Sequence, residues 1–399
     1  MTSIKGMSEA AEMGGTEETA ATVRALALDA EHRRAGASMR EHDGFSLPGH
    51  YGDMLAEYEA VRGGASAGLF DLSARGRVEV SGAEAVQFLN GLITNDVKTL
   101  EAGAWMHAAF PNAQGRLLAS VRVIREGDTF LFDTEAATHA RVLQTLERFT
   151  LAGDFRVRDL TAETVMLSVQ GARACDFVRN VLGEGASGVK HGRVFSAQLG
   201  GDEVTVLRAT HTSEDGFDLF TATNRAAGLW ASLVEAGARP AGFDALEVLR
   251  IEAGVPRYGV DVSDANVVLE AVREEETVSY TKGCYIGQEI IARIHWRGHI
   301  AKQLAGLIFD RNAEAPTDAV VKSCDAGKDV GRITSFTYSP RLKRMIALGI
   351  VKYDFLTHGT ELKIFTGGEA VCEAHVAQLP MVRGSWFDAA FVGNARAGA

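Results

Sequence analysis

The chain has 399 residues, of which 46% are apolar and 23% are charged, and its formal net charge is −11. This length accommodates two or three domains, and the composition is that of a globular protein with a large core. The acidic balance argues against non-specific binding to nucleic acid or anionic lipid, and no apolar run reaches transmembrane length. We therefore expect neither a nucleic acid nor a membrane as partner.

The first 40 residues are rich in Ala, Glu, Thr and Gly and contain few core residues. They lack the basic start and apolar block of an export signal, and Glu9, Glu12 and Glu17 argue against an organelle transit peptide. We predict a mobile tail over residues 1–40, with a short helix over residues 22–34. The expected location is the cytoplasm.

From residue 42 to about residue 235, amphipathic helices alternate with short strands. Gly63-Gly64 ends the first helix, Ser81 and Glu84 form a capping-box pattern before the second, and Glu126-Gly127-Asp128 predicts a hairpin turn. The pattern predicts helices at 51–62, 86–93, 139–146, 172–181 and 226–235, and strands at 78–80, 121–123, 130–132, 165–169, 204–207 and 217–220. We predict a mixed α/β core with many antiparallel strand pairs over residues 41–300.

After Lys302 the helical periodicity weakens and short apolar runs recur between turn residues. These runs cover residues 304–309, 330–336, 345–351, 361–365 and 371–376. Closely spaced short strands are typical of an all-β domain. We predict a β-barrel over residues 301–385 and a second tail over residues 386–399.

Residues 282–289 read Lys-Gly-Cys-Tyr-Ile-Gly-Gln-Glu. Glycine permits a tight turn around Cys284, and a nearby Lys282 or a following helix N-terminus favours the thiolate, which is the reactive form of cysteine. We therefore take Cys284 and Lys282 as candidate catalytic residues. The alternative is a turn entering a helix, with Cys284 as a small buried filler.

Several standard chemistries find no matching pattern in the sequence. The four cysteines lie far apart without a C-x-x-C pair, which indicates a reducing compartment with neither a disulfide framework nor a closed zinc site. The phosphate-loop, dinucleotide-binding and H-E-x-x-H motifs are missing. His295 and His299 have the spacing of a helical metal pair, but Gly298 disfavours a continuous helix there, and we predict no metal site.

One segment near this point is locally basic in an otherwise acidic chain. It is either a solvated face or a surface for an anionic ligand tail or a partner. Its members are Arg293, His295, Trp296, Arg297, His299 and Lys302.

From about residue 51 to residue 380, the chain resembles the folate-binding superfamily of the glycine-cleavage T protein, an aminomethyltransferase. The matching stretches occur in the family's order at residues 68–73 (GLFDLS), 92–97 (LITNDV), 249–254 (LRIEAG) and 337–340 (TYSP). The resemblance implies an α+β fold, with mixed α/β subdomains around a central cavity and a C-terminal β-barrel. It also implies tetrahydrofolate as the cofactor.

Two departures from the T-protein pattern concern chemistry. Residues 282–289 resemble the hallmark of the YgfZ branch, bacterial folate-binding proteins related to mitochondrial iron–sulfur assembly factors; T proteins usually have an aspartate at the position of Cys284. T proteins also carry paired aspartates where this chain has Ala119 and Ser120. A carboxylate can handle protons and stabilise charge at the transferred group, whereas an alanine cannot and a serine does so poorly.

The resemblance also indicates folate contacts. T proteins hold the pterin ring with the last glutamate of a stretch that reads HTSEDGFD here, at residues 211–218, so Asp218 is the candidate pterin anchor. His211 and Asn112 are further candidate cofactor-binding residues. An arginine that family members place before the LRIEAG stretch is Leu246 in this chain.

Two classes of function follow from the resemblance. In the first, a YgfZ-type protein binds tetrahydrofolate and supports iron–sulfur cluster assembly or repair through Cys284, with iron–sulfur assembly proteins as partners. In the second, the protein is a folate-dependent aminomethyltransferase or methyltransferase of the T-protein class. A folate sensor without turnover is a third reading, so the sequence leaves open whether the protein is an enzyme.

Overall fold

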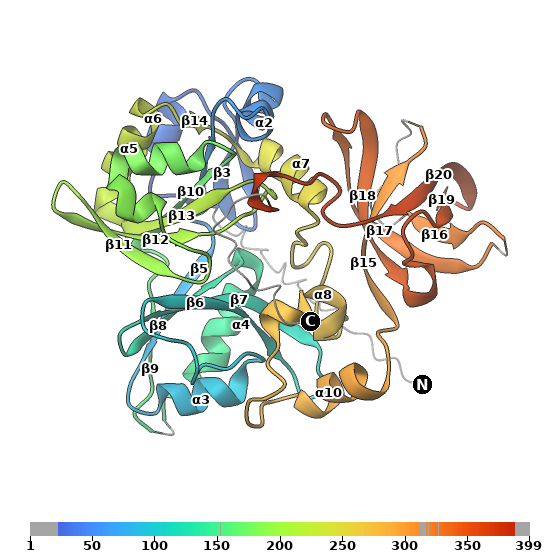
Figure 1. The fold of residues 1–399 in the computed structure, drawn as a ribbon, viewed down its shortest axis with the longest axis horizontal. Coiled ribbons are helices and arrows are strands. Elements are labelled where there is room, and N and C mark those ends of the chain that lie inside the picture. The colour runs from blue at the N-terminus through green and yellow to red at the C-terminus, as the bar shows by residue number, and fades with distance from the viewer. Residues whose placement is uncertain (1–22, 152, 312–316, 318, 326, 388–399) are drawn as a thin grey trace, which may run out of the picture.

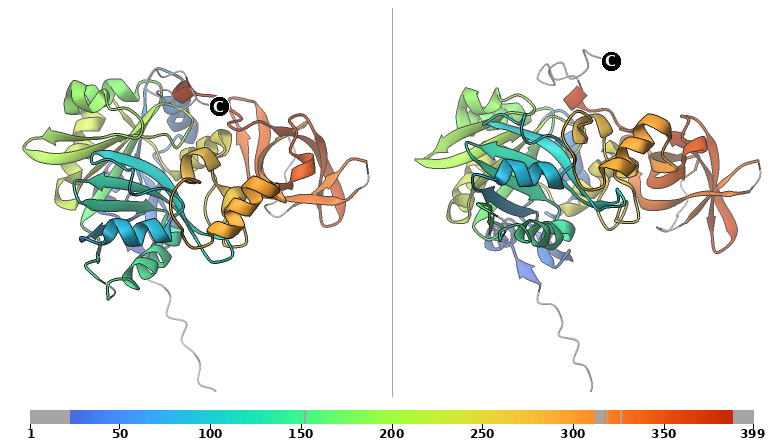
Figure 2. Two further views of the ribbon diagram at one scale, coloured as in Figure 1. Left: turned by 60° about the horizontal axis from the view of Figure 1, so that its bottom comes forward. Right: turned by 90° about the horizontal axis from the view of Figure 1, so that it is seen from below.

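The computed structural model describes residues 23–151, 153–311, 317, 319–325 and 327–387. In Figure 1 two sheets with their helices lie on one side of the molecule and a barrel lies on the other, with α7 (Phe243–Ala253) and α8 (Val268–Ala271) between them. Figure 2 shows that α10 (Gln288–Arg297) leads from the α/β part into the barrel. The predicted α+β architecture with a C-terminal barrel is therefore confirmed.

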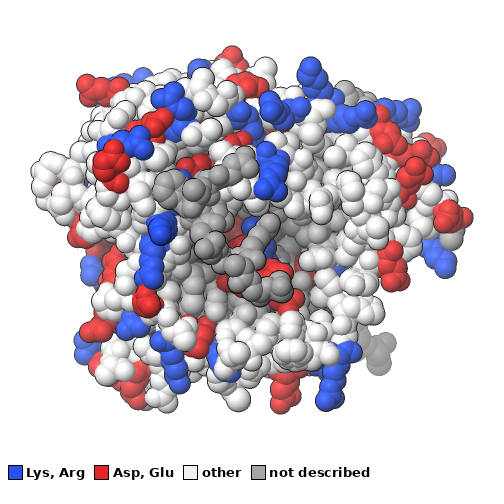
Figure 3. Space-filling view, in the orientation of Figure 1, with Lys and Arg blue, Asp and Glu red and all other residues white. Residues whose placement is uncertain are grey.

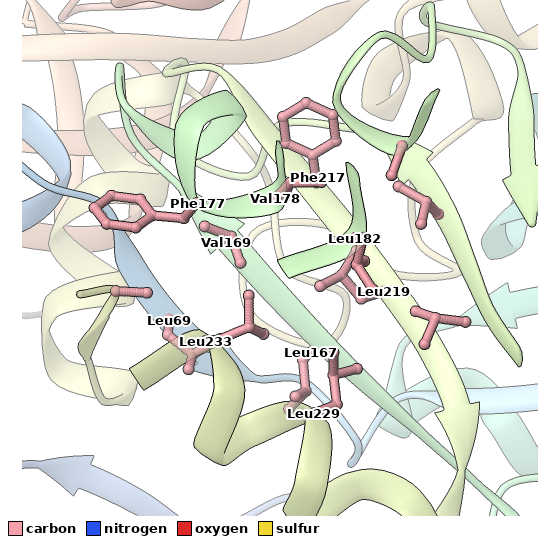
Figure 4. Packing of buried hydrophobic residues seen from close by; sticks show 14 of the residues in the cluster. Leu69, Leu167, Val169, Phe177, Val178, Leu182, Phe217, Leu219, Leu229 and Leu233 are labelled. Atoms are coloured by element: carbon pink, nitrogen blue, oxygen red, sulfur yellow. The ribbon is translucent and has the colours of Figure 1, made fainter. Parts of the chain in front are cut away.

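The first sheet has the strand order β11-β12-β13-β10-β4-β14. Its strands are β4 (Gly68–Asp71), β10 (Thr164–Gln170), β11 (Val194–Leu199), β12 (Asp202–Arg208), β13 (Gly216–Ala222) and β14 (Arg239–Pro240). Helices α5 (Ala174–Ser187) and α6 (Ala226–Glu235) cover one face. Figure 4 shows side chains of β10 and β13 packing against side chains of both helices, which buries this face.

The second sheet is antiparallel, with the strand order β6-β7-β8-β5-β9. Its strands are β5 (Gly76–Ser81), β6 (Ala104–Pro111), β7 (Leu117–Glu126), β8 (Thr129–Thr134) and β9 (Arg156–Asp159). Helices α3 (Ala85–Leu92) and α4 (Ala136–Glu147) bury their apolar faces against it. The opposite face meets the first sheet through a smaller core of Trp105, Ile124, Met166, Leu207, Ala209 and Phe220.

The predicted tail of residues 1–40 is wrong for the part that the structure describes. Residues 24–42 carry β1 (Arg24–Ala25), α1 (Asp29–Arg34) and β2 (Ser38–His42), and β3 (Phe45–His50) lies between the two strands in this small sheet. His32 is fully buried, with its ring 4.8 Å from that of Trp230 and its Nε2 atom 2.9 Å from Asp71. Because His32 is polar, its burial adds nothing to the apolar pattern of the sequence, and the ordered segment was therefore predicted as a tail. Residues 1–22, including the start of the expected helix, lie outside the described residues.

Helix α7 lies between the sheets and the barrel. On the side of the sheets it packs against α2 (Met54–Arg62) through Tyr58, Val61 and Leu249. After α8 and α9 (Glu274–Thr277), α10 ends at the start of the barrel. The described strands close into a barrel in the order β15-β18-β17-β16-β19-β20. They are β15 (Lys302–Phe309), β16 (Val320–Ser323), β17 (Asp329–Ser339), β18 (Arg344–Lys352), β19 (Glu361–Thr366) and β20 (Glu369–Ala377). We propose a domain boundary near residue 300, where helix gives way to barrel.

Two local expectations need correction. The capping box at Ser81 and Glu84 does not form, because the Glu84 carboxylate accepts a hydrogen bond from the Asp154 backbone at 2.8 Å. The second tail, expected from residue 386, begins in the structure with a 3₁₀ turn (Ser385–Phe387) in which Trp386 is buried; residues 388–399 lie outside the description. Within the described residues, no helix has the length and apolarity needed to cross a membrane.

Candidate functional site

The facing sides of the two sheets meet around Arg122 of β7. Side chains alternate along a strand. Ala119 therefore points into the core beneath α3 and α4, and Ser120 and Arg122 point toward the first sheet. Ser120 is thus the one of the two substituted positions that faces the site.

Arg122 joins the two sheets through two carboxylates. Its Nε atom donates to Asp133 Oδ2 of β8 at 2.7 Å, and its Nη1 atom donates to Asp218 Oδ2 of β13 at 2.5 Å. Both carboxylates are fully buried. Burial raises the pKa of Asp218, but the nearby His211 and Arg122 outweigh it and hold the pKa below its usual value. Asp218 is therefore an anion at neutral pH.

His211 is the second partner of Asp218. Its Nε2 atom lies 3.1 Å and 3.0 Å from the two oxygens of Asp218. Its side chain is 19% exposed, whereas that of Asp218 is 0% exposed. We call Arg122, Asp133, His211 and Asp218 the inter-sheet cluster. Of its two candidate cofactor-binding residues, only His211 has surface that a ligand could reach.

The loop that carries His211 is fixed from two sides. The His211 backbone N–H donates to Gln170 Oε1 at 3.0 Å. In the segment after the barrel, the Ser385 N–H donates to Glu214 Oε2 at 2.8 Å, and the Asp215 N–H donates to Ser385 Oγ at 3.0 Å. The carboxylate of Glu214 also pairs with Arg62 at 2.9 Å. The position of the imidazole is therefore set by rigid neighbours.

A group of rings lies next to the cluster on β6. His107 is the cross-strand neighbour of Arg122, and its ring lies edge-on to Trp105 at 5.1 Å. Burial, helped by the charge of Arg122, lowers the pKa of His107 to about 3. His107 is therefore a neutral imidazole that can serve as donor or acceptor for a ligand.

Asn112, the third candidate cofactor-binding residue, lies outside the inter-sheet cluster, in the turn between β6 and β7. Its Oδ1 atom accepts hydrogen bonds from the backbone of Gln114 at 2.9 Å and Arg116 at 3.0 Å. The turn packs on residues 282–289, since a Cβ atom at Gly287 would lie 2.3 Å from the Asn112 carbonyl oxygen. The structure shows Asn112 shaping this turn; its contact with folate stays a prediction.

Cys284 is exposed, so the reading that makes it a buried filler is wrong. We call residues 282–289 the Cys284 turn. The Ile286 N–H donates to the Gly91 carbonyl at 3.1 Å, and Gly287 has a φ of 80° before α10 begins. At Gly283 an added Cβ would meet nothing within 4 Å. The thiol therefore sits on the open side of a firmly held turn.

Lys282 is buried and points back into the protein. Its Nζ atom donates to the carbonyls of Ile93 at 2.7 Å and Asn95 at 2.6 Å and lies 5.1 Å from the Tyr285 ring centroid. Burial lowers its pKa to about 8. These contacts give Lys282 a structural role, and its predicted effect on the Cys284 thiol stays a prediction.

The described residues contain no group of three or more His, Cys, Asp or Glu side chains that could hold a metal ion. Helix α10 ends at Arg297, before His299, so the two histidines do not share one helix. His295 instead pairs with Glu274 and stacks on Tyr280 at 3.9 Å. Trp296 is 70% exposed beside it.

The inter-sheet cluster lines neither of the two hollows described next. One of about 550 Å³ lies between α2 and α6, and one of about 260 Å³ lies between residues 259–263 and β17. On the face drawn in Figure 3, basic and acidic side chains are scattered over the surface, with neither sign covering the whole face. The expected folate cavity near Asp218 stays a prediction.

Sequence reasoning missed Arg122, Asp133 and His107. The available signal was Arg122 itself, which stands between Val121 and Val123 in a strand buried on both faces. An arginine in such a strand needs buried anionic partners. Their identity comes only from the way the two sheets face each other.

Two family models together cover most of the chain. Residues 28–274 match the family model of the GCVT N-terminal domain, and residues 302–383 match that of the glycine cleavage T-protein C-terminal barrel domain. The chain therefore belongs to the glycine-cleavage T-protein family.

Curated relatives and a solved structure agree with this membership. A protein named Aminomethyltransferase from Rubrobacter xylanophilus is 34% identical over 330 residues, covering 83% of this chain and 87% of its own length. One of the same name from Thermus thermophilus is 33% identical over 329 residues, covering 80% and 89%. The crystal structure of the glycine cleavage system aminomethyltransferase T from Bartonella henselae superposes with a TM-score of 0.82 at 24% identity, over 90% of this chain and 98% of that one. The last comparison confirms the fold.

Proposed function

We propose that this protein binds tetrahydrofolate and transfers a one-carbon group, as an aminomethyltransferase or methyltransferase. The observation that carries the proposal is the match of both T-protein domains in one chain, together with relatives named Aminomethyltransferase at 33–34% identity. The runner-up reading of the sequence thus has more support than the first. Folate would bind against the exposed side of His211, with Asp218 behind it.

The substituted aspartates suggest a donor other than that of glycine cleavage. Ala119 is buried in the core, and Ser120 offers a hydroxyl where the family has a carboxylate facing the site. Loss of one well-placed acid–base or electrostatic group costs about 10²–10³ in rate. In a reconstituted glycine-cleavage assay we expect turnover lower than that of a T protein by this factor.

The direct test is anaerobic purification with tetrahydrofolate, followed by measurement of bound folate and of transfer from amine and thioether donors. We expect retained folate and transfer from at least one donor. A preparation that binds no folate and transfers from no donor would refute the proposal. Turnover equal to that of a T protein in glycine cleavage would refute only the proposal that the donor differs from that of glycine cleavage.

A second candidate function is favoured by the exposure of Cys284. In this YgfZ-type reading, the protein binds tetrahydrofolate and Cys284 supports iron–sulfur cluster assembly or repair. One thiolate cannot complete the ligand set of a cluster, so iron–sulfur assembly proteins would have to be partners. The test is restoration of iron–sulfur enzyme activity in cells that lack the protein. Cys284→Ser should fail there while keeping folate binding; full restoration would reject this reading.

The location is proposed to be the cytoplasm. This proposal is supported by the four cysteines, which are all free in the structure, as is typical of a reducing compartment. A fractionation experiment with tagged protein would check it.

A further inference from the structure

We propose that His211 and Asp218 act as an acid–base pair that takes over the proton handling of the family's missing aspartates. His211 exchanges a proton with the bound folate and donor, and Asp218 positions its imidazole. The inference rests on the proposed function and extends it by naming the group that moves the proton. It differs from the sequence prediction, in which both residues only bound the cofactor.

The geometry assigns different tasks to the two ring nitrogens. Asp218 is an anion and accepts hydrogen bonds, so the Nε2 atom of His211, at 3.0 Å and 3.1 Å from its oxygens, carries the hydrogen. In the neutral ring the other nitrogen, Nδ1, then has a free lone pair that can accept a proton. The imidazole is thus oriented as a base by a carboxylate that has no exposed surface of its own.

Asp218 is itself held in place by Arg122. The second carboxylate on Arg122, Asp133, also pairs with Arg75 at 2.7 Å. Two carboxylates and two arginines thus form a chain of alternating charge that ends at His211 and is buried except at Arg75, whose side chain is partly exposed. The chain thus fixes the oxygens of Asp218 beside the ring of His211.

The pair lies on the same side of the second sheet as the lost carboxylate. Ser120 and Arg122 are two residues apart on one face of β7, a separation of about 6.6 Å at about 3.3 Å per strand residue. Asp218 binds Arg122, and His211 binds Asp218. The proton-handling group has therefore moved from β7 to the loop before β13 without leaving the face between the sheets.

The chemical step balances without an oxidant or reductant. In the proposed transfer, a bond from folate N5 to the transferred carbon would form, and the bond from that carbon to the amine nitrogen or sulfur of the donor would break. N5 would lose one proton, and the leaving atom would gain one. His211 would accept the first proton and supply the second.

The test uses the full chain, tetrahydrofolate and the amine or thioether donor that the wild-type protein accepts. His211→Gln should lower kcat by about 10²–10⁴ while the folate dissociation constant stays unchanged. His211→Ala should show the same loss, and added imidazole should restore part of the rate. His211→Ala removes a contact to the buried Asp218, so the folding of both variants is checked by urea denaturation before their rates are compared.

Asp218 is tested as a positioning residue. Asp218→Asn should lower kcat with little change in the KM for folate, and Asp218→Glu should recover part of the loss. The matched control is His139→Gln, because His139 also pairs with an aspartate, Asp159 at 2.8 Å, but on α4 at the opposite face of the sheet. This variant should keep full activity.

The outcomes separate the two proposals. If the wild type transfers the carbon and His211→Gln does so equally fast, the acid–base pair is refuted and the proposed function stands. If His211→Gln weakens folate binding with kcat unchanged, His211 is a binding residue and the pair is again refuted. If the wild type transfers nothing from any donor, the proposed function fails and the pair fails with it.

Discussion

Arg122 lies between two buried carboxylates, whereas the sulfur of Cys284 stands exposed on a turn whose rigid parts are Gly287 and Lys282. In the inter-sheet cluster the candidate reactive groups also join the two sheets, so changing them should change stability. At the Cys284 turn the candidate reactive group and the supporting groups are different residues. Folding and function should therefore separate at Cys284 and remain coupled at Arg122.

The largest effect is expected from Arg122→Met. The change removes the cation shared by Asp133 and Asp218 and leaves two buried carboxylates with less compensation. We expect a loss of about 3–5 kcal/mol in the free energy of unfolding, measured by urea denaturation. The control is Arg156→Met, since Arg156 pairs with Asp154 at the surface and should cost no more than about 1 kcal/mol. Equal losses would mean that the cluster does not join the sheets.

A pair of glycine substitutions probes the frame of the Cys284 turn. Gly287→Ala combines a left-handed backbone with a Cβ atom 2.3 Å from the Asn112 carbonyl oxygen. It should cost about 2–4 kcal/mol by urea denaturation, from backbone strain and overpacking together. Gly283→Ala meets nothing within 4 Å and should cost much less. Similar costs at both positions would contradict the rigid role of Gly287.

The buried amine of Lys282 should make stability depend on alkaline pH. Its pKa is about 8 in the folded protein and about 10.5 when unfolded, so between these values the unfolded chain binds more protons. Stability contributed by Lys282 therefore rises with pH across this window, by about 1–3 kcal/mol. The measurement is urea denaturation of the wild type and Lys282→Met from pH 7 to 10.5. A difference between the two proteins that stays constant with pH would show that the Lys282 pKa is not lowered.

The smallest effect on folding is expected at Cys284 itself. Cys284→Ser removes no buried contact and should change the free energy of unfolding by no more than about 0.5 kcal/mol. In the native protein an alkylating reagent should modify Cys284 before the others, because Cys372 is buried and burial raises the pKa of the Cys175, Cys324 and Cys372 thiols. Peptide mapping after brief alkylation measures this order. Modification of Cys284 only after denaturation would contradict its exposure.

Local patterns in the sequence predicted most of the secondary structure. The helix expected at residues 226–235 matches α6, and the turn at residues 126–128 joins β7 to β8. Strand β16 was missed because Val320–Ser323 is too short for a period of two to be visible. The buried anchor at His32 was missed because a histidine carries no apolar signal.

The candidate site was predictable only in part. The family resemblance pointed to His211 and Asp218, and the structure places their side chains in contact. It could not show that Arg122 neutralises Asp218, because that contact joins residues 96 positions apart on different sheets. The same limit applies to Lys282, whose proximity to Cys284 in the sequence suggested a contact. Its ammonium group instead turns toward the carbonyls after α3.

The last described residues tie the segment after the barrel to the middle of the chain. After the barrel, Gly384, Ser385 and Trp386 bind Ser213, Glu214 and Asp215, a few residues from His211. A fragment that ends at residue 300 would contain every member of the inter-sheet cluster and still lack the segment that clasps its loop. The segment after the barrel therefore holds the loop of His211 in place, and removing it should loosen a candidate site that the barrel strands do not line.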